Sequence, residues 1–332
     1  MRFLPTGEQA DFARTLHSLL ASAEVPAAVR AWAAGDPAPG RALWGRLARA
    51  GVFALAAEEE YDGAGLLPVE LSMALVECGR AGVPGPVVET AAASLLLSRL
   101  ARTGDEALAK RFLPGLVSGE ASATLTLPGT GPYALDADAA PYCFTVSQEG
   151  ELRLAPVSGS GLLRSTDPAR RLFRPPPGGE LLAAGPRVVA AAREAASWAR
   201  LLTAAQCLGV GLALLERTVE YAKQRSQFGA PIGSFQAVKH RLADTLLALE
   251  FARPLVWAAA LAPGPGEVAA AKLAAGEAAY GAAMTALQLH GAVGYTEELD
   301  LSLWLRKARP LRDAWGTPAQ CRAEVLRAAA GR

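Results

Sequence analysis

The chain has 332 residues, 51% of them hydrophobic, and can therefore bury a large core in two or three structural parts of one globular unit. Its 33 Lys and Arg residues nearly balance its 32 Asp and Glu residues, and the net charge of +1 provides no global attraction to nucleic acid or anionic lipid. Nucleic acid is therefore not expected as a partner. The four cysteines are far apart and form no zinc-site pattern with a histidine, so we expect buried thiols and no metal site.

The first residues, MRFLPTGEQADFARTLHSLL, lack a basic region followed by a continuous apolar stretch and a cleavage site, so a signal peptide is not expected. Apolar runs elsewhere are interrupted by Arg, Glu or Gly before they could span a bilayer. We therefore expect a cytoplasmic protein with no membrane partner.

Residues 1–117 show helical periodicity, which predicts an N-terminal all-α domain. The helical segments are EQADFARTLHSLLAS, RALWGRLARAGVF, VELSMALVECGRAG and VETAAASLLLSRLA, with the acidic loop EEEYDGAGLL between the second and the third. Residues 118–185 instead contain the short extended pieces SATLTL, YCFTV and ELRLAPV, separated by turn residues. They predict a small β-domain, closed by the Pro- and Gly-rich run at 175–179.

The helical pattern returns over residues 186–332. Helices are expected at 187–225, 235–261, 266–290 and, shorter, after Thr317. Long helices with short connections predict a C-terminal four-helix bundle. The expected fold class is therefore mainly α with a small β-domain.

The stretch YAKQRSQFGAPIGSFQAVKHRLAD interrupts the bundle pattern at a corner. We expect the first helix to end at Gly229, Pro231 to block its continuation, and Ser234 to cap the next helix. Apolar residues then recur at helical spacing, and their face is predicted to be core. These residues are Phe235, Val238, Leu242, Leu246 and Leu249.

Arg225 and Phe228 are expected at the exposed part of this corner. A guanidinium there could bind a phosphate, and an aromatic ring could flank a planar group. The alternative interpretation is a surface arginine beside a capping hydrophobic residue.

Two stretches, YAKQRSQFGAPIGSFQAVKHRLAD and LQLHGAVGYTEELDLSLWLRKA, resemble the two signatures of the acyl-CoA dehydrogenase family of flavoproteins. The stretch LARAGVFALAAEEEYDGAGLLPVELSMALVECGRAG is similar to that family's helix, acidic loop and helix unit, so the resemblance covers nearly the whole chain. It implies an N-terminal helical domain, a central β-domain, shortened here, and a C-terminal four-helix bundle. FAD would lie between the bundle and the β-domain, with its ADP half reaching a neighbouring subunit.

The resemblance implies FAD contacts at six positions. Arg225 and Phe228 would meet the pyrophosphate and adenine side of an FAD supplied by the partner, and Gln236 would line the same FAD. Gln288 and Gly291 would hold the ADP portion from the opposite subunit, where glycine leaves room for the backbone to approach phosphate.

Thr317 matches the family's glycine-threonine element near the flavin. The sequence departs from the family at Ala292, in place of a glycine, and at Ala319, in place of a glutamine, while Gln320 is displaced by one position. The alternative interpretations are a surface amide at Gln288 and a helix N-cap at Thr317.

The family's reaction requires a carboxylate base for the α-proton of the thioester, while the flavin accepts a hydride. The base would precede the glycine-threonine element or lie on the first bundle helix, and this chain has Trp315 and Ala199 there. Asp313 and Glu194 are nearby in sequence but are expected to be solvent-facing charges. No catalytic residue is therefore assigned.

The β-domain also departs from the family, since Leu127 replaces a glutamate in TLTLPGTGPY. It resembles the trimmed version of short actinobacterial relatives, some of which work as unlike pairs in which one chain supplies the base. The resemblance therefore favours a subunit that completes the FAD site of a homo- or hetero-oligomer, a dimer or a tetramer. The substrate would be acyl-CoA or another acyl thioester, and an electron-transferring flavoprotein would accept the electrons.

Two alternatives remain open. One is an active homo-oligomeric dehydrogenase with a non-standard base such as Asp313, and the other is a flavin-free scaffold or acyl-thioester binding protein. Gly159 and Gly161 lack the third glycine of a dinucleotide fingerprint, and the scattered histidines predict neither a catalytic triad nor a metal site.

Overall fold

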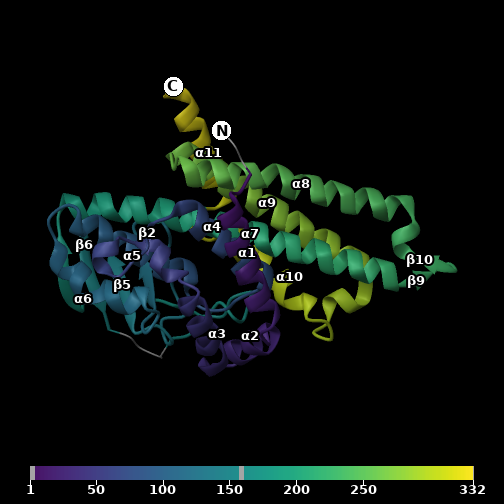
Figure 1. Cartoon of the computed structure of the whole chain (residues 1–332), viewed down its shortest axis with the longest axis horizontal. Helices are drawn as coiled ribbons and strands as arrows, with labels where there is room; N and C mark the ends of the chain where they lie inside the picture. Colours follow the sequence, from purple (N-terminus) through teal and green to yellow (C-terminus); the bar gives the residue numbers. More distant parts are fainter. Residues whose placement is uncertain (1–3, 157–160, 332) are drawn as a thin grey trace.

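A computed structural model describes residues 4–156 and 161–331, so Gly159 of the dismissed glycine pattern lies outside the described residues. The longest element is α7, Pro186–Gln224, which crosses the molecule from end to end (Figure 1). Its 39 residues make it about 58 Å long. Although α7 is long and apolar enough to cross a membrane, 89% of its most apolar window is buried in the protein, so it is a core helix.

The N-terminal part is helical and packs on α7 through α4 and α5. Its helices are α1 (Gly7–Ala21), α2 (Val25–Ala33), α3 (Ala38–Arg49), α4 (Pro68–Ala81), α5 (Val87–Ala101) and α6 (Glu106–Val117). The predicted acidic loop, residues 58–67, contains the turn η2 (Glu59–Tyr61) and the strand β2 (Gly65–Leu66). The turn η1 (Phe53–Leu55) and the strand β1 (Ala56–Ala57), which pairs with β2, come directly before the loop. Two helices were not predicted from the sequence: α2, which is only nine residues long, and α6, which contains a proline.

The β-domain contains a four-stranded sheet in the order β3-β5-β6-β8. Its strands are β3 (Ala123–Thr126), β5 (Tyr142–Val146), β6 (Glu151–Ala155) and β8 (Glu180–Ala184), and β3 pairs parallel to β5 while the other pairs are antiparallel. A separate pair is formed by β4 (Ala134–Leu135) and β7 (Leu172–Phe173). The three predicted strands are confirmed as β3, β5 and β6.

Asp136, directly after β4, links the β-domain to the N-terminal helices and is fully buried. Its Oδ1 accepts hydrogen bonds from the Trp32 indole Nε1 at 3.0 Å and from the Arg171 backbone N at 3.1 Å. Its Oδ2 has no hydrogen-bond partner among the described residues. Burial is the largest cause that raises the pKa of this carboxyl, to about 7.

The C-terminal part contains α7, α8 (Gln236–Leu261), α9 (Pro265–His290), α10 (Leu301–Asp313) and α11 (Pro318–Ala330). The α9 helix packs against all four of the others. The long helices α7, α8 and α9 match their predicted bounds within one residue. The predicted division after residues 117 and 185 falls between elements, and the three-domain division itself stays a prediction.

Two glycines allow α4 and α7 to touch backbone to backbone. A Cβ atom at Gly79 would lie 2.1 Å from the Gln206 carbonyl oxygen, and a Cβ at Gly209 would lie 1.9 Å from the Val76 carbonyl oxygen. Both distances are shorter than any van der Waals contact, so only glycine fits at either position. This close approach holds the middle of α7 against the N-terminal helices.

The corner after α7 differs from the prediction. The helix ends at Gln224 rather than Gly229, because the chain becomes extended at Arg225 and forms a tight hairpin of β9 (Ser226–Gln227) and β10 (Ala230–Pro231). The prediction that Ser234 caps α8 is also wrong. Its hydroxyl donates to the Pro231 carbonyl oxygen within the turn η3 (Ile232–Ser234), and Phe235 occupies the cap position.

The predicted core face of α8 is only partly buried. Leu249 is buried, whereas Leu246 is 45% exposed and Phe235 is 38% exposed. Helical periodicity shows that a helix has an apolar stripe but not which element covers it. In the described part of this chain, no element covers the outer half of that stripe.

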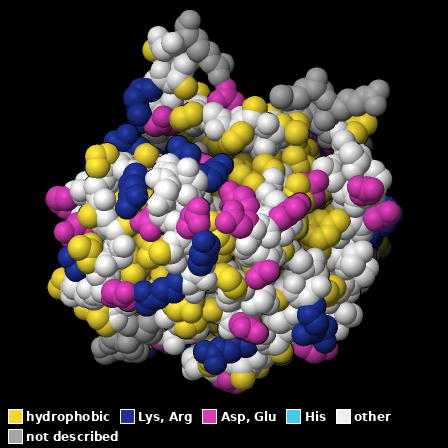
Figure 2. Space-filling view, turned by 60° about the vertical axis from the view of Figure 1, so that its left-hand side comes forward, with side chains coloured by type: hydrophobic (Ala, Val, Ile, Leu, Met, Phe, Trp, Pro, Cys, Tyr) yellow, Lys and Arg dark blue, Asp and Glu magenta, His cyan; other side chains and the backbone are white. Residues whose placement is uncertain are grey.

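The composition predicts a surface without a dominant charge and buried cysteine thiols. On the face drawn in Figure 2, Lys and Arg side chains alternate with Asp and Glu side chains, and no single sign dominates. The four cysteines are buried, and desolvation raises the pKa of the Cys78 thiol to about 12.

Candidate functional site

The two predicted signatures meet at the hairpin end of the molecule. The Tyr221 ring, near the end of α7, stacks on the His290 ring, at the end of α9, with ring centres 4.1 Å apart. The turn η4 (Gly291–Tyr295) follows α9 directly. Five of the six predicted FAD-contact residues belong to this end and are solvent-exposed. They are Arg225, Phe228, Gln236, Gln288 and Gly291.

The hairpin presents Phe228 to solvent. Its ring is 94% exposed, and its only ring contact among the described residues is an edge-on one with Phe235 at 6.3 Å. Its φ of +55° is uncommon for a bulky residue. Arg225 has no ion pair within the described chain. An exposed ring and an unpaired guanidinium three residues apart in the sequence suit a ligand that is planar and anionic.

A second site lies at the opposite half of α7. A cavity of about 540 Å³ opens between α7, the loop after β3, the β5–β6 turn and α11. Its polar lining includes Arg193, Ser197 and Arg200 of α7, and Gly129 of the predicted TLPGTG stretch forms part of the wall. Arg193 has no ion pair among the described residues, so the cavity has an uncompensated positive charge at its edge.

Thr317, the sixth predicted residue, lies apart from the other five, at the start of α11. It forms a capping box, in which its Oγ1 accepts from the Gln320 backbone N and its own backbone N donates to the Gln320 Oε1 at 2.9 Å. The N-cap interpretation is therefore confirmed, and Gln320 is the other member of the capping box. A contact of Thr317 with flavin stays a prediction.

The turn before Thr317 is held from two sides. The Arg200 Nε donates to the Trp315 carbonyl oxygen at 3.0 Å. The buried Lys272 ammonium donates to the carbonyl oxygens of Arg312 and Gly316, at 2.8 Å and 3.3 Å, and desolvation lowers the pKa of Lys272. This network places residue 315 beside the α7 residues around position 200.

The Trp315 side chain reaches α5. Its indole Nε1 donates to the Glu89 Oε1 at 3.1 Å. Glu89 is 4% exposed, and burial raises the pKa of its carboxyl. The sequence analysis missed this residue, although a single glutamate within the apolar run VVETAAASLLL was a signal that could have identified it.

Comparison with known proteins identifies the family. Family models for the N-terminal and C-terminal domains of acyl-CoA dehydrogenases match residues 6–120 and 189–330. The acyl-CoA dehydrogenase IpdE2 of Mycobacterium tuberculosis is 37% identical over 97% of this chain and 96% of its own length. IpdE2 of Mycolicibacterium smegmatis is 30% identical over 92% of this chain and 94% of its own length. This chain belongs to the acyl-CoA dehydrogenase family.

Solved structures of acyl-CoA dehydrogenases share the fold. Butyryl-CoA dehydrogenase of Megasphaera elsdenii matches with a TM-score of 0.82 and 23% identity over 99% of this chain and all of its own. The ChsE4–ChsE5 complex of Mycobacterium tuberculosis matches with a TM-score of 0.81 and 24% identity over all of both chains. The expected fold, with helical N- and C-terminal domains around a small β-domain, and the expected class of flavoprotein oxidoreductase are confirmed.

The two positions at which acyl-CoA dehydrogenases are expected to place the base are neighbours in this chain. Ala199 is fully buried and directly precedes Arg200, whose guanidinium holds the carbonyl group of residue 315. Neither Ala199 nor Trp315 can abstract a proton. The bond between Arg200 and Trp315 brings the backbone of residue 315 close to α7 at the residue that follows Ala199.

The nearby carboxylates of this acyl-CoA dehydrogenase are paired with arginines. Asp313 lies 3.4 Å from the Arg309 guanidinium one turn earlier in α10. Glu194 lies within 3.3 Å of both Arg99 and Arg102 on the surface of α5. Asp313 and Glu194 were predicted to be solvent-facing charges, and their side chains are 40% and 38% exposed.

Proposed function

We propose that this chain is a subunit of an FAD-dependent acyl-CoA dehydrogenase that introduces an α,β double bond into an acyl thioester. In this role it completes the FAD site of the assembly and does not supply the catalytic base. An electron-transferring flavoprotein is the expected acceptor, and the cytoplasm is the expected compartment. The proposal accords with the family assignment and extends it to this chain's own part in the reaction.

The length of α7 is the observation that supports a shared FAD site. Arg200 lines the cavity, whereas Arg225 begins the hairpin, and 25 residues of helix separate them by about 37 Å. One flavin dinucleotide is too short to touch both. If both sets of residues bind FAD, each FAD must therefore contact two chains, with the cavity of one chain facing the hairpin of another.

The residues at the hairpin end suit the ADP half of FAD. The Arg225 guanidinium could pair with the pyrophosphate, and the Phe228 ring could stack on the adenine. Gln236 and Gln288 offer amide groups, and Gly291, whose φ is +61°, lets the backbone approach a phosphate. When bound, the isoalloxazine of FAD accepts a hydride from the β-carbon of the thioester.

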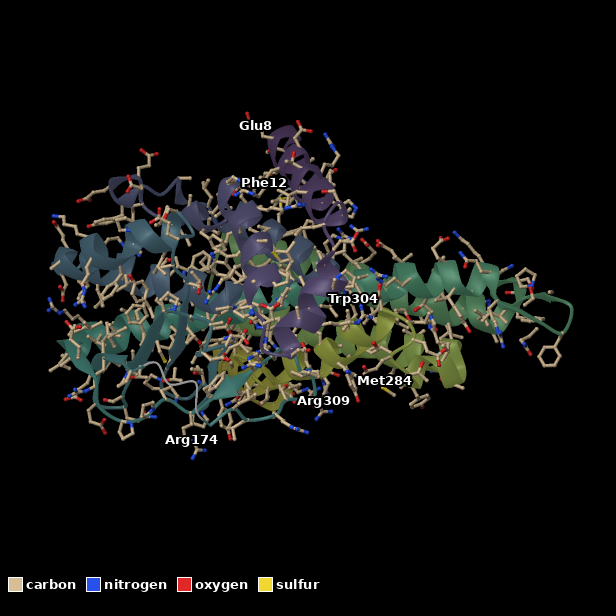
Figure 3. All side chains as sticks on the ribbon, turned by 90° about the horizontal axis from the view of Figure 1, so that it is seen from below. Glu8, Phe12, Arg174, Met284, Trp304 and Arg309 are labelled. Atoms are coloured by element: carbon tan, nitrogen blue, oxygen red, sulfur yellow. The ribbon has the colours of Figure 1, made fainter. Side chains whose placement is uncertain are left out.

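The uncovered face of α8 supports an oligomer. A groove of about 750 Å³ runs along the packed helices α8 and α9, and it is lined by Phe251, Leu255 and Thr285 together with charged residues. Phe251 is 73% exposed, and Met284 of α9 points away from the helices on the hairpin half of the molecule (Figure 3). Large apolar side chains gathered on one face usually mark a protein interface.

The residues at the two positions of the catalytic base, 199 and 315, are the reason for proposing a partner of different sequence. A homo-oligomer would contain Trp315 and Ala199 in every subunit, and no site in it would have a base at either place. A partner with a glutamate at one of these positions would supply the base beside an FAD that this chain helps to bind. The ChsE4–ChsE5 complex is an example, within the same fold, of two chains in one assembly.

The test is to purify the chain alone and after co-expression with an acyl-CoA dehydrogenase chain that has a glutamate at the position of Trp315, encoded in the same genome. We expect the lone chain to bind little FAD, measured from the visible absorption of flavin, and the pair to bind about one FAD per two chains. A lone chain with one FAD per chain and measurable dehydrogenase activity would instead establish an active homo-oligomer. A co-expressed pair that binds no flavin would favour the alternative of a flavin-free scaffold or acyl-thioester binding protein.

A further inference from the structure

The two base positions locate the reacting part of the acyl pocket. A base at either position removes the same α-proton, so both must face the same carbon atom of the thioester. In this chain the two positions lie close together, because Arg200, the residue after Ala199, donates its Nε hydrogen to the Trp315 carbonyl oxygen at 3.0 Å. The α-carbon of a thioester bound to this chain would therefore lie next to residue 315, where α7 faces α5.

A tryptophan side chain extends through this place. From the turn beside α7, the Trp315 indole reaches α5 and donates its Nε1 hydrogen to the Glu89 Oε1 at 3.1 Å. Glu89 is 4% exposed, and the Trp315 ring packs against the main hydrophobic core. The indole is the largest side chain, and an acyl chain cannot occupy the same volume.

The backbone keeps the indole in this orientation. Trp315 has a φ of +57°, in the left-handed region that bulky residues rarely adopt. Such a conformation persists only where the surroundings enforce it. Here Arg200 holds the carbonyl group of Trp315, and Lys272, which is 1% exposed, holds that of the next residue, Gly316.

We propose that Trp315, held by Glu89, closes the acyl pocket of this chain, so that the assembly binds its thioester only in the pocket of the partner chain. The inference rests on the proposed function, because that function defines where the pocket lies. It goes beyond the loss of the base, because it predicts that the chain cannot bind the thioester, whether or not a reaction follows. Glu89 and Trp315 are positioning residues rather than catalytic ones.

The experiment measures thioester binding without catalysis. The full-length chain and its variants are titrated with octanoyl-CoA by isothermal titration calorimetry, with free coenzyme A as the control ligand. Trp315→Ala removes the indole and is expected to bind octanoyl-CoA at least tenfold more tightly than the wild type. Trp315→Leu serves the same purpose if the alanine variant does not fold. Trp315→Phe keeps most of the bulk and is expected to bind as weakly as the wild type.

The outcomes separate this inference from the proposed function. A wild-type chain that binds octanoyl-CoA as tightly as Trp315→Ala would overturn the inference, whatever its flavin content. Equal gains for octanoyl-CoA and free coenzyme A would overturn it too, because they would show that the indole does not exclude the acyl chain. If co-expression with the partner yields no flavin but the acyl-selective gain appears, the shared FAD site is wrong and the closed pocket stands.

Glu89→Leu tests whether the hydrogen bond between Glu89 and Trp315 is needed to keep the pocket closed. Without its hydrogen-bond acceptor the indole is less firmly held, and octanoyl-CoA is expected to bind several-fold more tightly than to the wild type. Glu89→Gln keeps an acceptor oxygen and is the matched control, with an expected affinity within about twofold of the wild type. Equal affinities for the leucine and glutamine variants would exclude Glu89 from the closure.

Discussion

Phe228 allows a direct test of the shared FAD site. Its ring has almost no contact within its own chain, so truncation should leave folding intact. A base stacked on an aromatic ring is worth about 1–3 kcal/mol, and Phe228→Ala should therefore weaken FAD binding to the assembly by about fivefold to 150-fold. Phe228→Tyr keeps the ring and should bind FAD normally. Measurement is by flavin fluorescence on dilution, and an unchanged affinity for the alanine variant would remove Phe228 from the site.

Asp313 offers a test of the alternative base. Its carboxylate is paired with Arg309 and partly exposed, so it lacks the burial that usually tunes a catalytic carboxylate. We expect Asp313→Asn to leave the turnover of the assembly within a few fold of the wild type. A collapse of turnover with flavin retained would make this chain the catalytic one.

Asp136 should make the stability of the fold depend on pH. Its pKa is about 7 in the folded chain against an ordinary value of 3.8, so between these values the folded state binds a proton that the unfolded state has lost. The free energy of unfolding should therefore be highest near pH 4 with respect to this group and should fall as the pH rises to about 7, by up to a few kcal/mol.

The matched variant is Asp136→Asn, which keeps an acceptor for the Trp32 indole and cannot ionise. It should flatten the decrease in thermal stability between about pH 4 and pH 7. The measurement is the melting temperature as a function of pH. A variant that keeps the full decrease would assign it to another group.

Single residues also show where sequence reasoning stops. Arg225 and Phe228 were predicted to be exposed because a glycine and a proline interrupt the helix there, and they are exposed. The apolar run around Glu89 marks it as an unusual glutamate, but the sequence does not reveal that Trp315, more than 200 residues away, donates a hydrogen bond to it. Local sequence predicts where a helix stops, whereas a hydrogen bond between distant segments depends on the tertiary fold.

At the scale of elements, the contact between α4 and α7 depends on Gly209. A methyl group there would lie 1.9 Å from the Val76 carbonyl oxygen, which belongs to backbone and cannot rotate away. Gly209→Ala should therefore force the two helices apart and lower the free energy of unfolding by about 3 kcal/mol or more. Gly45→Ala in α3, where the added methyl would meet only the Arg49 guanidinium at 3.5 Å, is the control. Urea denaturation measures both, and equal stabilities would contradict the close packing.

The elements also differ in how well they could be predicted. Residues 187–225, 235–261 and 266–290 were predicted within one residue because a long apolar periodicity averages over many positions. The strands β4 and β7 have two residues each and are too short to show any alternation. The outer stripe of α8 was taken for core because an apolar stripe has the same periodicity whether or not another element of the chain covers it.

At the scale of the whole molecule, the uncovered face of α8 predicts the oligomeric state. A charge at Phe251, as in Phe251→Glu, should prevent association and leave a monomer that has lost the shared FAD. Leu181→Glu places the same charge on a half-exposed leucine of β8, in the β-domain rather than on the uncovered face, and should not change the assembly. Light scattering after size-exclusion chromatography measures the molar mass. A wild-type chain that is monomeric both alone and with its partner would contradict the interface.

The span of α7 has a consequence for genetics. If the hairpin binds a flavin in the neighbouring chain, as proposed, a lesion at Arg225 or Phe228 would appear as a defect of the partner's enzyme, although the partner's gene is intact. Extra copies of the partner gene would not rescue such a strain, since the missing groups belong to this chain. Null alleles of the two genes would cause the same phenotype, and the growth defect of the double mutant would be no more severe than that of either single mutant.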